Sequence, residues 1–347
     1  MKKKAIVALS GGLDSSVTAL LLQQQGYEVI GVTGKMMNSP CSGVVCDNAR
    51  TVAEKLGIEH YTIDVSKTFQ AKVVDYFETA YSQGKTPNPC IECNKFIKWG
   101  ELFDIAMSRF DADVFATGHY AQIKNIDGVA KLYPARDSKK DQLYFLYRLP
   151  QRVLIKTLFP LYDYDKTQVR ELAAQYDLPS KSAKESQDIC FIQKPYTTKK
   201  YLLEKFGQQG GNFVEKSTGK ILGRHEGCYQ YTIGQRKGIG IAYPYPLYVL
   251  EIDAVNNVVY LGKEDENYSN NLLVKDLNLS YIREEKEFSA MVKIRYNMSA
   301  VPAKVFVDGN SARVIFDNPV NSVTKGQACV FYDKQDGHLI GGGEIEG

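Results

Sequence analysis

Long apolar runs are missing from this sequence of 347 residues. No apolar stretch approaches the ~20 residues that a helix needs to span a bilayer, so the sequence predicts no membrane segment. The first residues, MKKKAIVALSGG, begin with the positive charge of a signal peptide. Their apolar part is too short for one, however, and passes at once into a glycine-rich loop, so we interpret it as a first strand. We therefore expect a cytoplasmic protein without a membrane partner.

Internal repeats, low-complexity segments and an even set of cysteines are also missing. The chain has 7 cysteines, an odd number that argues against a disulfide framework. Redox chemistry, metal binding and core packing remain as roles, and Cys228 and Cys329 stand in the apolar β context of core residues. The net charge is +3 and the composition, 44% hydrophobic and 24% charged, is that of a globular protein. The length suits two or three domains.

The first part of the chain alternates strand and helix patterns. Strands are expected at 4–9, 27–33, 59–65 and 113–119, and helices at 15–25, 48–57, 67–82 and 95–110. Strands separated by helices predict a parallel sheet with right-handed crossovers. Ligands then bind at the carboxyl ends of the strands, which here are the segments ALSGG, GVTGK and ATGH.

From about residue 206 the chain becomes rich in glycine and short strand patterns. These patterns lie at 245–253, 257–262, 290–296, 303–308, 311–317 and 327–333. The dipeptides Asp308-Gly309 and Asp336-Gly337 predict hairpins, hence antiparallel pairing. We predict an α/β protein in three parts: a parallel-sheet catalytic domain at 1–205, a mostly β linking domain at 206–272, and an antiparallel β-barrel at 273–347.

The glycine loop after the first strand has the residues of a phosphate site. In ALSGGLDSS, Gly11 and Gly12 let the backbone approach an anion, and the following helix start offers free N–H groups and a favourable dipole. Ser10, Ser15 and Ser16 can add hydroxyl donors. An ordinary turn between strand and helix, with an Asx-type cap, is the plain alternative.

The same loop lacks a lysine. Walker loops carry one, which supports attack at the γ-phosphate of the nucleotide. Without it, the loop suits pyrophosphate recognition, in which ATP is cleaved between the α- and β-phosphates. Asp14 cannot bind phosphate directly, but its carboxylate can hold Mg²⁺.

Two further segments place cysteines beside cationic residues. GKTPNPCIECNKFIKWG sets Cys90 and Cys93 just before an amphipathic helix that carries Lys95 and Lys98. A helix start and nearby ammonium groups lower the pKa of a thiol, so this segment predicts a reactive thiolate. The second segment, KESQDICFIQ, contains Cys190. The alternative for the Cys-x-x-Cys pair is half of a zinc site, completed by Cys41 and Cys46.

Taken together, these segments resemble a known family. SGGLDS resembles the S-G-G-x-D-S signature of the pyrophosphatase-loop (PP-loop, N-type ATP) family, whose fold is adenine-nucleotide alpha-hydrolase-like. PNPCIECNKFIKW and ESQDICFI are similar to motifs of tRNA-specific 2-thiouridylases, and YTIGQRKGIGI, VKIRYNM and GGGEIE match later motifs of that family. The resemblance covers essentially the whole chain in order. It implies ATP-dependent 2-thiolation of the wobble uridine in tRNA for Lys, Glu and Gln, with Mg²⁺, a cysteine desulfurase and a sulfur-relay protein.

The resemblance also implies residue roles. Cys93 is the nucleophile and Cys190 the persulfide carrier, while the target base meets Asn88, Pro89 and Cys90. The nucleotide site comprises Ala8, Leu9, Ser10, Gly11, Gly12, Leu13, Asp14, Ser15, Gly34 and Gly118. Gly34 stands where the family usually has Met and contacts adenine by its backbone. The tRNA contacts are His119, Lys140, Asp141, Gln142, Arg295, Tyr296 and Gln327. His119 as a loop cap, and Lys140 and Arg295 as solvated residues, are the alternatives. Arg236 and Lys237 are expected phosphate contacts on charge alone.

One departure from the family opens a second route for sulfur. Cys90 stands where the family usually has Asp, so three thiolates, Cys90, Cys93 and Cys190, are available to a [4Fe–4S] cluster whose fourth iron stays open for sulfide. Two other functions also remain. One is a PP-loop ligase or amidotransferase for a small molecule, although no glutaminase-like segment is present. The other is a non-catalytic tRNA-binding protein with zinc on Cys41, Cys46, Cys90 and Cys93.

Overall fold

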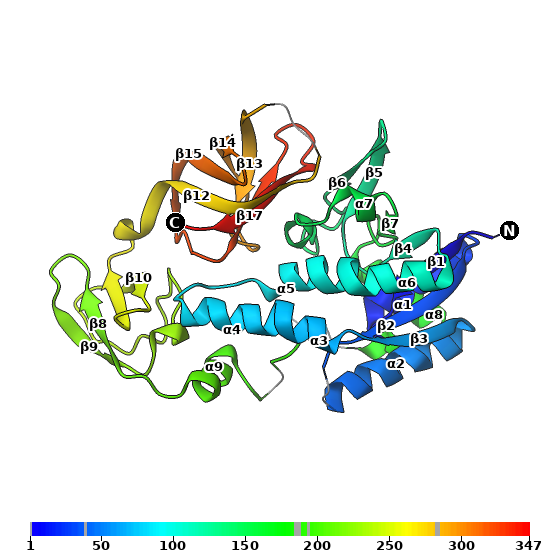
Figure 1. Ribbon diagram of the computed structural model, residues 1–347, viewed down its shortest axis with the longest axis horizontal. Helices are drawn as coiled ribbons and strands as arrows, with labels where there is room; N and C mark the ends of the chain where they lie inside the picture. Colours follow the sequence, from blue (N-terminus) through cyan, green and yellow to red (C-terminus); the bar gives the residue numbers. More distant parts are fainter. Residues whose placement is uncertain (1, 38–39, 184–188, 193–194, 282–284) are drawn as a thin grey trace.

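A parallel sheet forms the first part of the molecule (Figure 1). The computed structural model describes residues 2–37, 40–183, 189–192, 195–281 and 285–347. The sheet order is β3-β2-β1-β4-β7, and every neighbouring pair is parallel, as predicted. Its strands are β1 (Lys4–Ala8), β2 (Glu28–Lys35), β3 (Glu59–Asp64), β4 (Val114–Ala116) and β7 (Thr157–Leu158).

Helices cover both faces of this sheet, which explains its continuous apolar strands. Ile6 packs in the cluster under the helices that carry Cys93, and Ala5 and Val7 face α1 and α2 on the other side. The helices are α1 (Leu13–Gln24), α2 (Pro40–Leu56), α3 (Ser66–Phe69), α4 (Asp75–Ser82), α5 (Pro89–Glu92), α6 (Leu102–Phe110), α7 (Gln151–Leu154), α8 (Lys166–Gln175) and α9 (Thr198–Phe206). The 3₁₀ segments here are η3 (Leu143–Leu146) and η4 (Pro179–Ser182).

Two predicted helices contain π-helical turns. The expected helix 67–82 is α3, the π segment η1 (Gln70–Val74) and α4, and the expected helix 95–110 is the π segment η2 (Cys93–Glu101) followed by α6. Gly100 breaks the helical backbone inside η2, with φ −104° and ψ −113°. The sequence patterns also missed a hairpin of β5 (Gln122–Ile126) and β6 (Val129–Tyr133), strand β7 and helix α8.

The linking domain contains four strands in the order β10-β11-β8-β9. They are β8 (Gly211–Glu215), β9 (Ile221–His225), β10 (Tyr248–Asp253) and β11 (Val258–Gly262), with 3₁₀ turns η5 (Cys228–Gln230) and η6 (Asp265–Asn267). The pairing of β11 with β8 is parallel, whereas an antiparallel arrangement was expected throughout. The reason is a long connection between β9 and β10, which lets β11 return beside β8 in the same direction.

The last part is a closed barrel in the order β12-β15-β14-β13-β16-β17, with neighbours antiparallel as predicted. Its strands are β12 (Tyr268–Leu279), β13 (Glu287–Lys293), β14 (Val301–Asp308), β15 (Ser311–Asn321), β16 (Ala328–Tyr332) and β17 (Leu339–Ile345). Both predicted hairpins exist, since Gly309 joins β14 to β15 and Gly337 lies between β16 and β17. The expected division between residues 272 and 273 falls inside β12.

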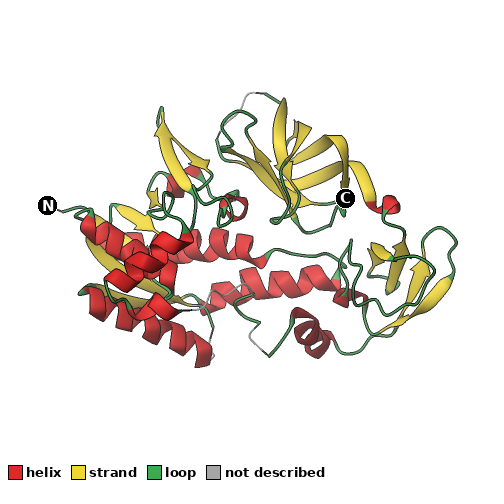
Figure 2. Cartoon of the chain, turned by 180° about the vertical axis from the view of Figure 1, so that it is seen from behind, coloured by secondary structure: helices red, strands yellow, loops and turns green. Residues whose placement is uncertain are grey.

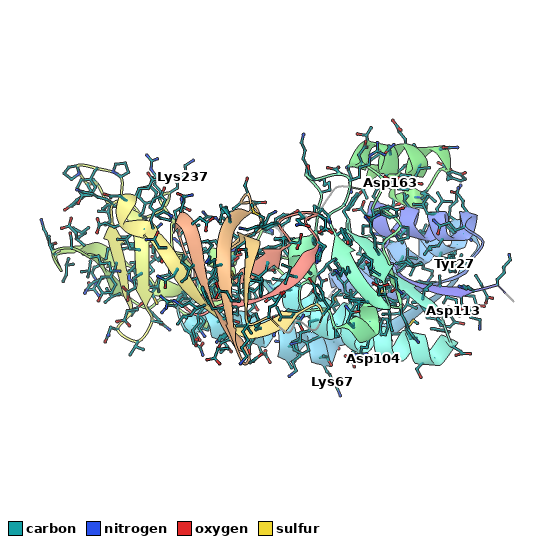
Figure 3. The ribbon with its side chains drawn as sticks, turned by 90° about the horizontal axis from the view of Figure 1, so that it is seen from above. Tyr27, Lys67, Asp104, Asp113, Asp163 and Lys237 are labelled. Carbon is teal, nitrogen blue, oxygen red and sulfur yellow. The ribbon has the colours of Figure 1, made fainter. Side chains whose placement is uncertain are left out.

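The barrel lies over the helices that lead out of the sheet. In Figure 1, α4 and the α5–α6 run extend from the sheet toward the linking domain, and Figure 2 shows that strands and loops make up most of the linking domain and the barrel. Tyr144 donates a hydrogen bond to the Ala328 carbonyl (2.9 Å), and Asn278 donates one to the Tyr147 carbonyl (2.6 Å). Lys237 lies at the far end of the molecule from Tyr27 (Figure 3). No helix among the described residues is long and apolar enough to cross a bilayer.

Candidate active site

The glycine loop has a backbone that only glycine permits. Gly11 has φ +71°, and a Cβ added there would lie 2.5 Å from the backbone nitrogen of Ala49. Gly12 caps α1, and its carbonyl accepts hydrogen bonds from the Ser15 hydroxyl (3.0 Å) and the Ser16 hydroxyl (2.8 Å). These bonds hold the loop in shape at the start of a helix. A glycine loop at a helix start is the arrangement in which backbone N–H groups can meet an anion, and the assignment of residues 8–15 to a nucleotide stays a prediction.

A second strand end closes on the same loop. Gly118, which follows β4, lies so near Asp14 that an added Cβ would come within 2.8 Å of the Asp14 backbone carbon. Parallel strand ends at one edge of a sheet produce this approach. Gly34 lies on β2 at that edge too, and an added Cβ there would contact Val65 at 3.3 Å. Close packing thus excludes a side chain at Gly118, whereas at Gly34 a Cβ would only have to displace the Val65 side chain slightly.

The carboxylate of Asp14 binds a lysine from a remote helix. Lys166 Nζ lies 2.7 Å from Asp14 Oδ1 and 2.9 Å from Oδ2, and the Tyr120 hydroxyl donates to Oδ1 at 2.9 Å. Neither partner was predicted from the sequence, because Lys166 and Tyr120 are separated from Asp14 by 152 and 106 positions. The capping box of Asp165 and Gln168 does signal a helix start at Lys166, but it does not reveal what that lysine contacts.

Cys90 and Cys93 lie in the first turns of the α5–η2 helix, which begins at Pro89 and so includes both cysteines, whereas the sequence placed them just before a helix at 95–110. Asn88 caps it by accepting a hydrogen bond from the Cys90 N–H (3.2 Å), and Pro89 occupies the first turn. Cys93 starts the π-helical segment η2, a type of turn that is frequent at functional sites. Cys93 is buried, with 7% of its surface exposed, while Cys90 and Cys190 are exposed. All three are free thiols.

The three thiols share one electrostatic environment with Lys98. Burial raises the pKa of Cys93 to about 12, the charged forms of Cys190 and Cys90 raise it as well, and Lys98 opposes them. Surrounding protein atoms also raise the pKa of Cys90 and Cys190, again against Lys98, although both residues keep an exposed surface. The predicted lowering of the thiol pKa is therefore wrong for the protein without its substrates. Desolvation of the thiolates outweighs the lysine and the helix start.

His119 connects the thiol region to the nucleotide loop. It follows Gly118, and its Nε2 lies 3.4 Å from Lys98 Nζ while its Nδ1 is hydrogen-bonded to the Thr117 hydroxyl at 2.7 Å. Burial and then Lys98 hold the pKa of His119 well below its usual value, so the ring is neutral. Trp99 packs against the same ring. Lys98 is thus near the three thiols and also contacts His119, which directly follows Gly118.

Most other expected tRNA contacts form hydrogen bonds inside the protein. Tyr296 donates to the Asp141 carbonyl (3.0 Å), which joins the barrel to the 140–142 loop. The Gln142 side chain accepts from the Tyr120 N–H (3.0 Å), and Arg295 donates to Asn321. Lys140 is half-buried on the same loop. These contacts show that the structure brings the 140–142 loop and Tyr296 together.

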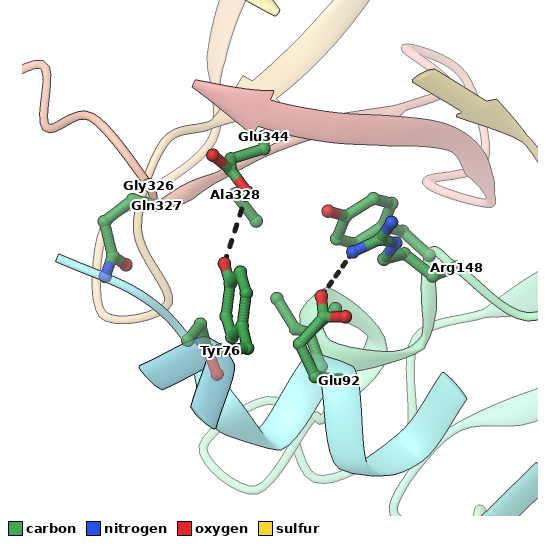
Figure 4. A pocket seen from close by; sticks show the side chains of 10 residues that line it. Tyr76, Glu92, Arg148, Gly326, Gln327, Ala328 and Glu344 are labelled. Carbon is green, nitrogen blue, oxygen red and sulfur yellow. Dashed lines mark hydrogen bonds and ion pairs between the residues drawn. The ribbon is translucent and has the colours of Figure 1, made fainter. Parts of the chain in front are cut away.

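Asn88 and Gln327 line one small cavity between the catalytic domain and the barrel (Figure 4). The Gln327 side chain donates to the Thr86 carbonyl at 2.8 Å. The complete lining is Tyr76, Asn88, Ile91, Glu92, Tyr147, Arg148, Gly326, Gln327, Ala328 and Glu344. The cavity has room for about one water molecule. It is therefore too small for a nucleobase.

An ion pair that was not predicted from the sequence lines this cavity. Arg148 donates to Glu92, and only 7% of the Glu92 side chain and 13% of the Arg148 side chain are exposed. Burial raises the pKa of Glu92, and Arg148 opposes that change. Opposite the pair, Tyr76 donates to Glu344 at 3.2 Å (Figure 4). Polar groups of the catalytic domain and of the barrel therefore meet beside α5, the short helix that precedes Cys93.

The zinc site that was the alternative for the Cys-x-x-Cys pair is not tested by the described residues, because it includes the side chain of Cys41. Among these residues, the one group of metal-ligand atoms that lie within 4.8 Å of one another is Asp333, Asp336 and His338. Both ring nitrogens of His338 are hydrogen-bonded, to Asp336 and to Tyr281. The side chain of Cys41 lies outside the described residues, as do residues 185–188 of the ESQDICFI motif. A four-iron cluster is larger than a single ion, so its thiolates need not lie within that distance.

Comparison with known proteins gives matches along the whole chain. Residues 3–194 match a family described as "tRNA methyl transferase HUP domain", 199–263 "tRNA methyl transferase PRC-barrel domain" and 269–345 "Aminomethyltransferase beta-barrel domain". The "tRNA-specific 2-thiouridylase MnmA" of Carboxydothermus hydrogenoformans is 44% identical over 363 residues, which cover 99% of this chain and 98% of that protein. The protein of the same name from Pelobacter propionicus is 42% identical over 350 residues, covering 99% and 97%.

One solved structure is similar over a smaller part of the chain. It is the "U34-tRNA thiolase NcsA from Methanococcus maripaludis with its [4Fe-4S] cluster". That protein is 23% identical, and the match covers 58% of this chain and 64% of that one, with a TM-score of 0.37. A likeness of this size carries no argument about the cysteines described above.

Proposed function

This chain belongs to the family of tRNA-specific 2-thiouridylases, and we propose that it replaces the 2-oxygen of the wobble uridine in tRNA with sulfur, using ATP. The observation that carries this proposal is the continuous path from the glycine loop to the thiols. Gly118 packs on Asp14, His119 contacts Lys98, and Lys98 acts on the pKa of all three cysteines. This path supports the proposal that nucleotide and sulfur chemistry share one site.

In the first step, the uracil 2-oxygen attacks the α-phosphate of ATP. A bond forms between that oxygen and the α-phosphorus, the bond to the β-phosphate oxygen breaks, and pyrophosphate leaves. The glycine loop binds the phosphates through backbone N–H groups at the start of α1. Asp14 is the residue that would hold Mg²⁺, which neutralises phosphate charge when it is bound. Gly34 and Gly118 border the adenosine side.

In the second step, a sulfur atom attacks carbon 2 of the activated base. We assign the sulfur to a persulfide on Cys190, whose terminal sulfur forms the new bond while AMP leaves. Cys93 then attacks the Cys190 sulfur, the persulfide bond breaks, and thiouridine is released with a Cys93–Cys190 disulfide left behind. An external thiol reduces that disulfide. A cysteine desulfurase and a sulfur-relay protein are the proposed source of the persulfide.

A second candidate for the sulfur source rests on Cys90. Three free thiols in one region are a donor set that fits a [4Fe–4S] cluster, which would supply sulfide when bound. In that case, Cys90 is required as a ligand. In the persulfide route, Cys90 only borders the base. Its exposed position suits either role.

The target base has to leave the anticodon stack, which costs a few kcal/mol. The cavity behind Asn88 is too small for uracil, so we propose that the base approaches Cys90 from the exposed side. His119, Lys140, Gln142, Arg295 and Gln327 are proposed tRNA contacts around this approach. The expected substrates are the tRNAs for Lys, Glu and Gln, and the expected location is the cytoplasm.

The test separates the two steps with cysteine variants. With ATP, unmodified tRNA and a sulfur donor, we expect Cys190→Ser to release pyrophosphate but to form no thiouridine, measured by mass spectrometry of digested tRNA. Cys228→Ser, in the core of the linking domain, is the matched control and should do both. Normal thiouridine formation by Cys190→Ser would refute the assignment. Iron and sulfide analysis of parent and Cys90→Ser then decides between the two sulfur sources.

A further inference from the structure

Lys166 occupies the place of the cation that the glycine loop lacks. Its ammonium group contacts both carboxylate oxygens of Asp14, at 2.7 and 2.9 Å, beside the loop and the first turn of α1. The side chain is only 14% exposed, whereas the side chains of most other lysine pairs in the described residues are far more exposed, such as Lys181 at 49%. Lys166 is thus a nearly buried charge beside a phosphate-binding loop.

Helix α8 holds this lysine in a fixed position relative to the loop. The capping box of Asp165 and Gln168 sets the helix start, where Lys166 is the first residue. Val169 and Ala173 on the same helix are fully buried against residues of α1 in one apolar cluster. The ammonium group therefore stays within side-chain reach of the α1 start even if its contacts change.

We propose that Lys166 is a phosphate-binding residue that pairs with Asp14 in the nucleotide-free protein and passes to the β- and γ-phosphates when Mg²⁺·ATP binds. This inference rests on the proposed use of ATP. Asp14 cannot bind Mg²⁺ and keep both of its contacts to the ammonium group, because the two cations compete for the same oxygens. The ammonium group then lies beside the phosphate site, where the negative oxygens of bound ATP favour a cation.

The chemistry of the site favours phosphate as the partner of the ammonium group. Residues 8–16 contain no lysine or arginine, so the loop itself adds no positive side chain to balance the leaving pyrophosphate. Lysine presents three donors as a compact charge, which suits phosphate oxygens that are not arranged for a planar guanidinium. The Tyr120 hydroxyl keeps its bond to Asp14 during the exchange, so the carboxylate retains a partner.

Calorimetric titration tests the proposal by comparing AMP with α,β-methylene-ATP, which cannot transfer AMP. In the presence of Mg²⁺, we expect Lys166→Met to bind AMP within about twofold of the parent. It should bind the ATP analogue about 10- to 100-fold more weakly, the range of a lost charge-assisted hydrogen bond. Lys166→Arg, which keeps the charge, should lie between the two. Lys181→Met, at an exposed pair with Asp177, is the control and should match the parent for both nucleotides.

If Lys166→Met weakens the binding of AMP and of the analogue equally, the proposal is overturned, because a residue that only supports folding would affect both nucleotides alike. Unchanged binding of the analogue would overturn it too. Thermal unfolding of each variant shows whether the site remains folded, and the AMP titration confirms this at the site itself. If the parent protein forms thiouridine and Lys166→Met binds the analogue as tightly as the parent does, this inference is refuted and the proposed function is not. A parent that binds the analogue yet forms no thiouridine contradicts the proposed function instead.

Discussion

The buried thiol of Cys93 should react slowly and with an unusual pH dependence. Its pKa of about 12, against 9.0 for an ordinary thiol, results mainly from burial. At about pH 8, this difference in pKa lowers the fraction of Cys93 that is thiolate roughly 900-fold. Because only the thiolate is the nucleophile, the reaction rate would fall by the same factor if nucleophilicity were unchanged. The greater nucleophilicity of a more basic thiolate recovers a factor of about 15 to 30. The net expectation is alkylation about 30- to 60-fold slower than at an ordinary exposed thiol.

The assay is alkylation with iodoacetamide, read out at each cysteine by mass spectrometry of peptides. The pH slope separates the pKa effect from restricted access, because poor access lowers the rate equally at every pH. The Cys93 rate should rise about tenfold per pH unit without levelling off between about pH 7 and pH 10, whereas a thiol of pKa 9.0 levels off near the upper end.

Lys98→Met provides the perturbation. Lys98 lowers the pKa of Cys93, Cys90 and Cys190, so its removal should raise each pKa and slow the alkylation of all three at a given pH. Lys67→Met, on the surface of α3 (Figure 3), should change none of them. A Cys93 rate that levels off below about pH 9, or that is unaffected in Lys98→Met, would show that burial and Lys98 do not control this thiol.

Two further predictions concern other charged groups. Arg148→Met leaves the Glu92 carboxylate buried without its partner and should lower the free energy of unfolding by about 3–5 kcal/mol, whereas Arg152→Met, at an exposed pair with Asp104, should cost no more than about 1 kcal/mol. Urea unfolding followed by fluorescence of Trp99, the single tryptophan, measures both, and equal costs would contradict the argument. If Lys140, Lys237 and Arg295 contact tRNA phosphates, each alanine substitution should reduce the log–log salt slope of tRNA binding by about 0.7–0.9. A triple variant with the parent's slope would place these residues away from the tRNA.

The sequence by itself determined the features that depend on neighbouring residues. Alternating strand and helix patterns predicted the parallel sheet, and the two Asp-Gly dipeptides predicted barrel hairpins that the structure contains. The SGGLDS segment predicted a loop that only glycine at position 11 permits. The sequence placed Cys90 and Cys93 just before a helix, and in the structure both lie in the first turns of that helix. Backbone preferences and turn chemistry act over a few residues, so these features can be read from the sequence alone.

Tertiary structure decided the pairings and the charge states at the site. Lys166 lies against Asp14 beside a loop that has no cation of its own, yet the two residues are separated by 152 positions, and no local pattern connects them. Arg148 and Glu92 meet only because two distant segments pack together. The thiol pKa values rise where the sequence predicted a fall, because burial depends on every segment that covers a sulfur atom. A local pattern shows the charges next to a thiol, but only the packed protein shows how much water the thiolate would lose.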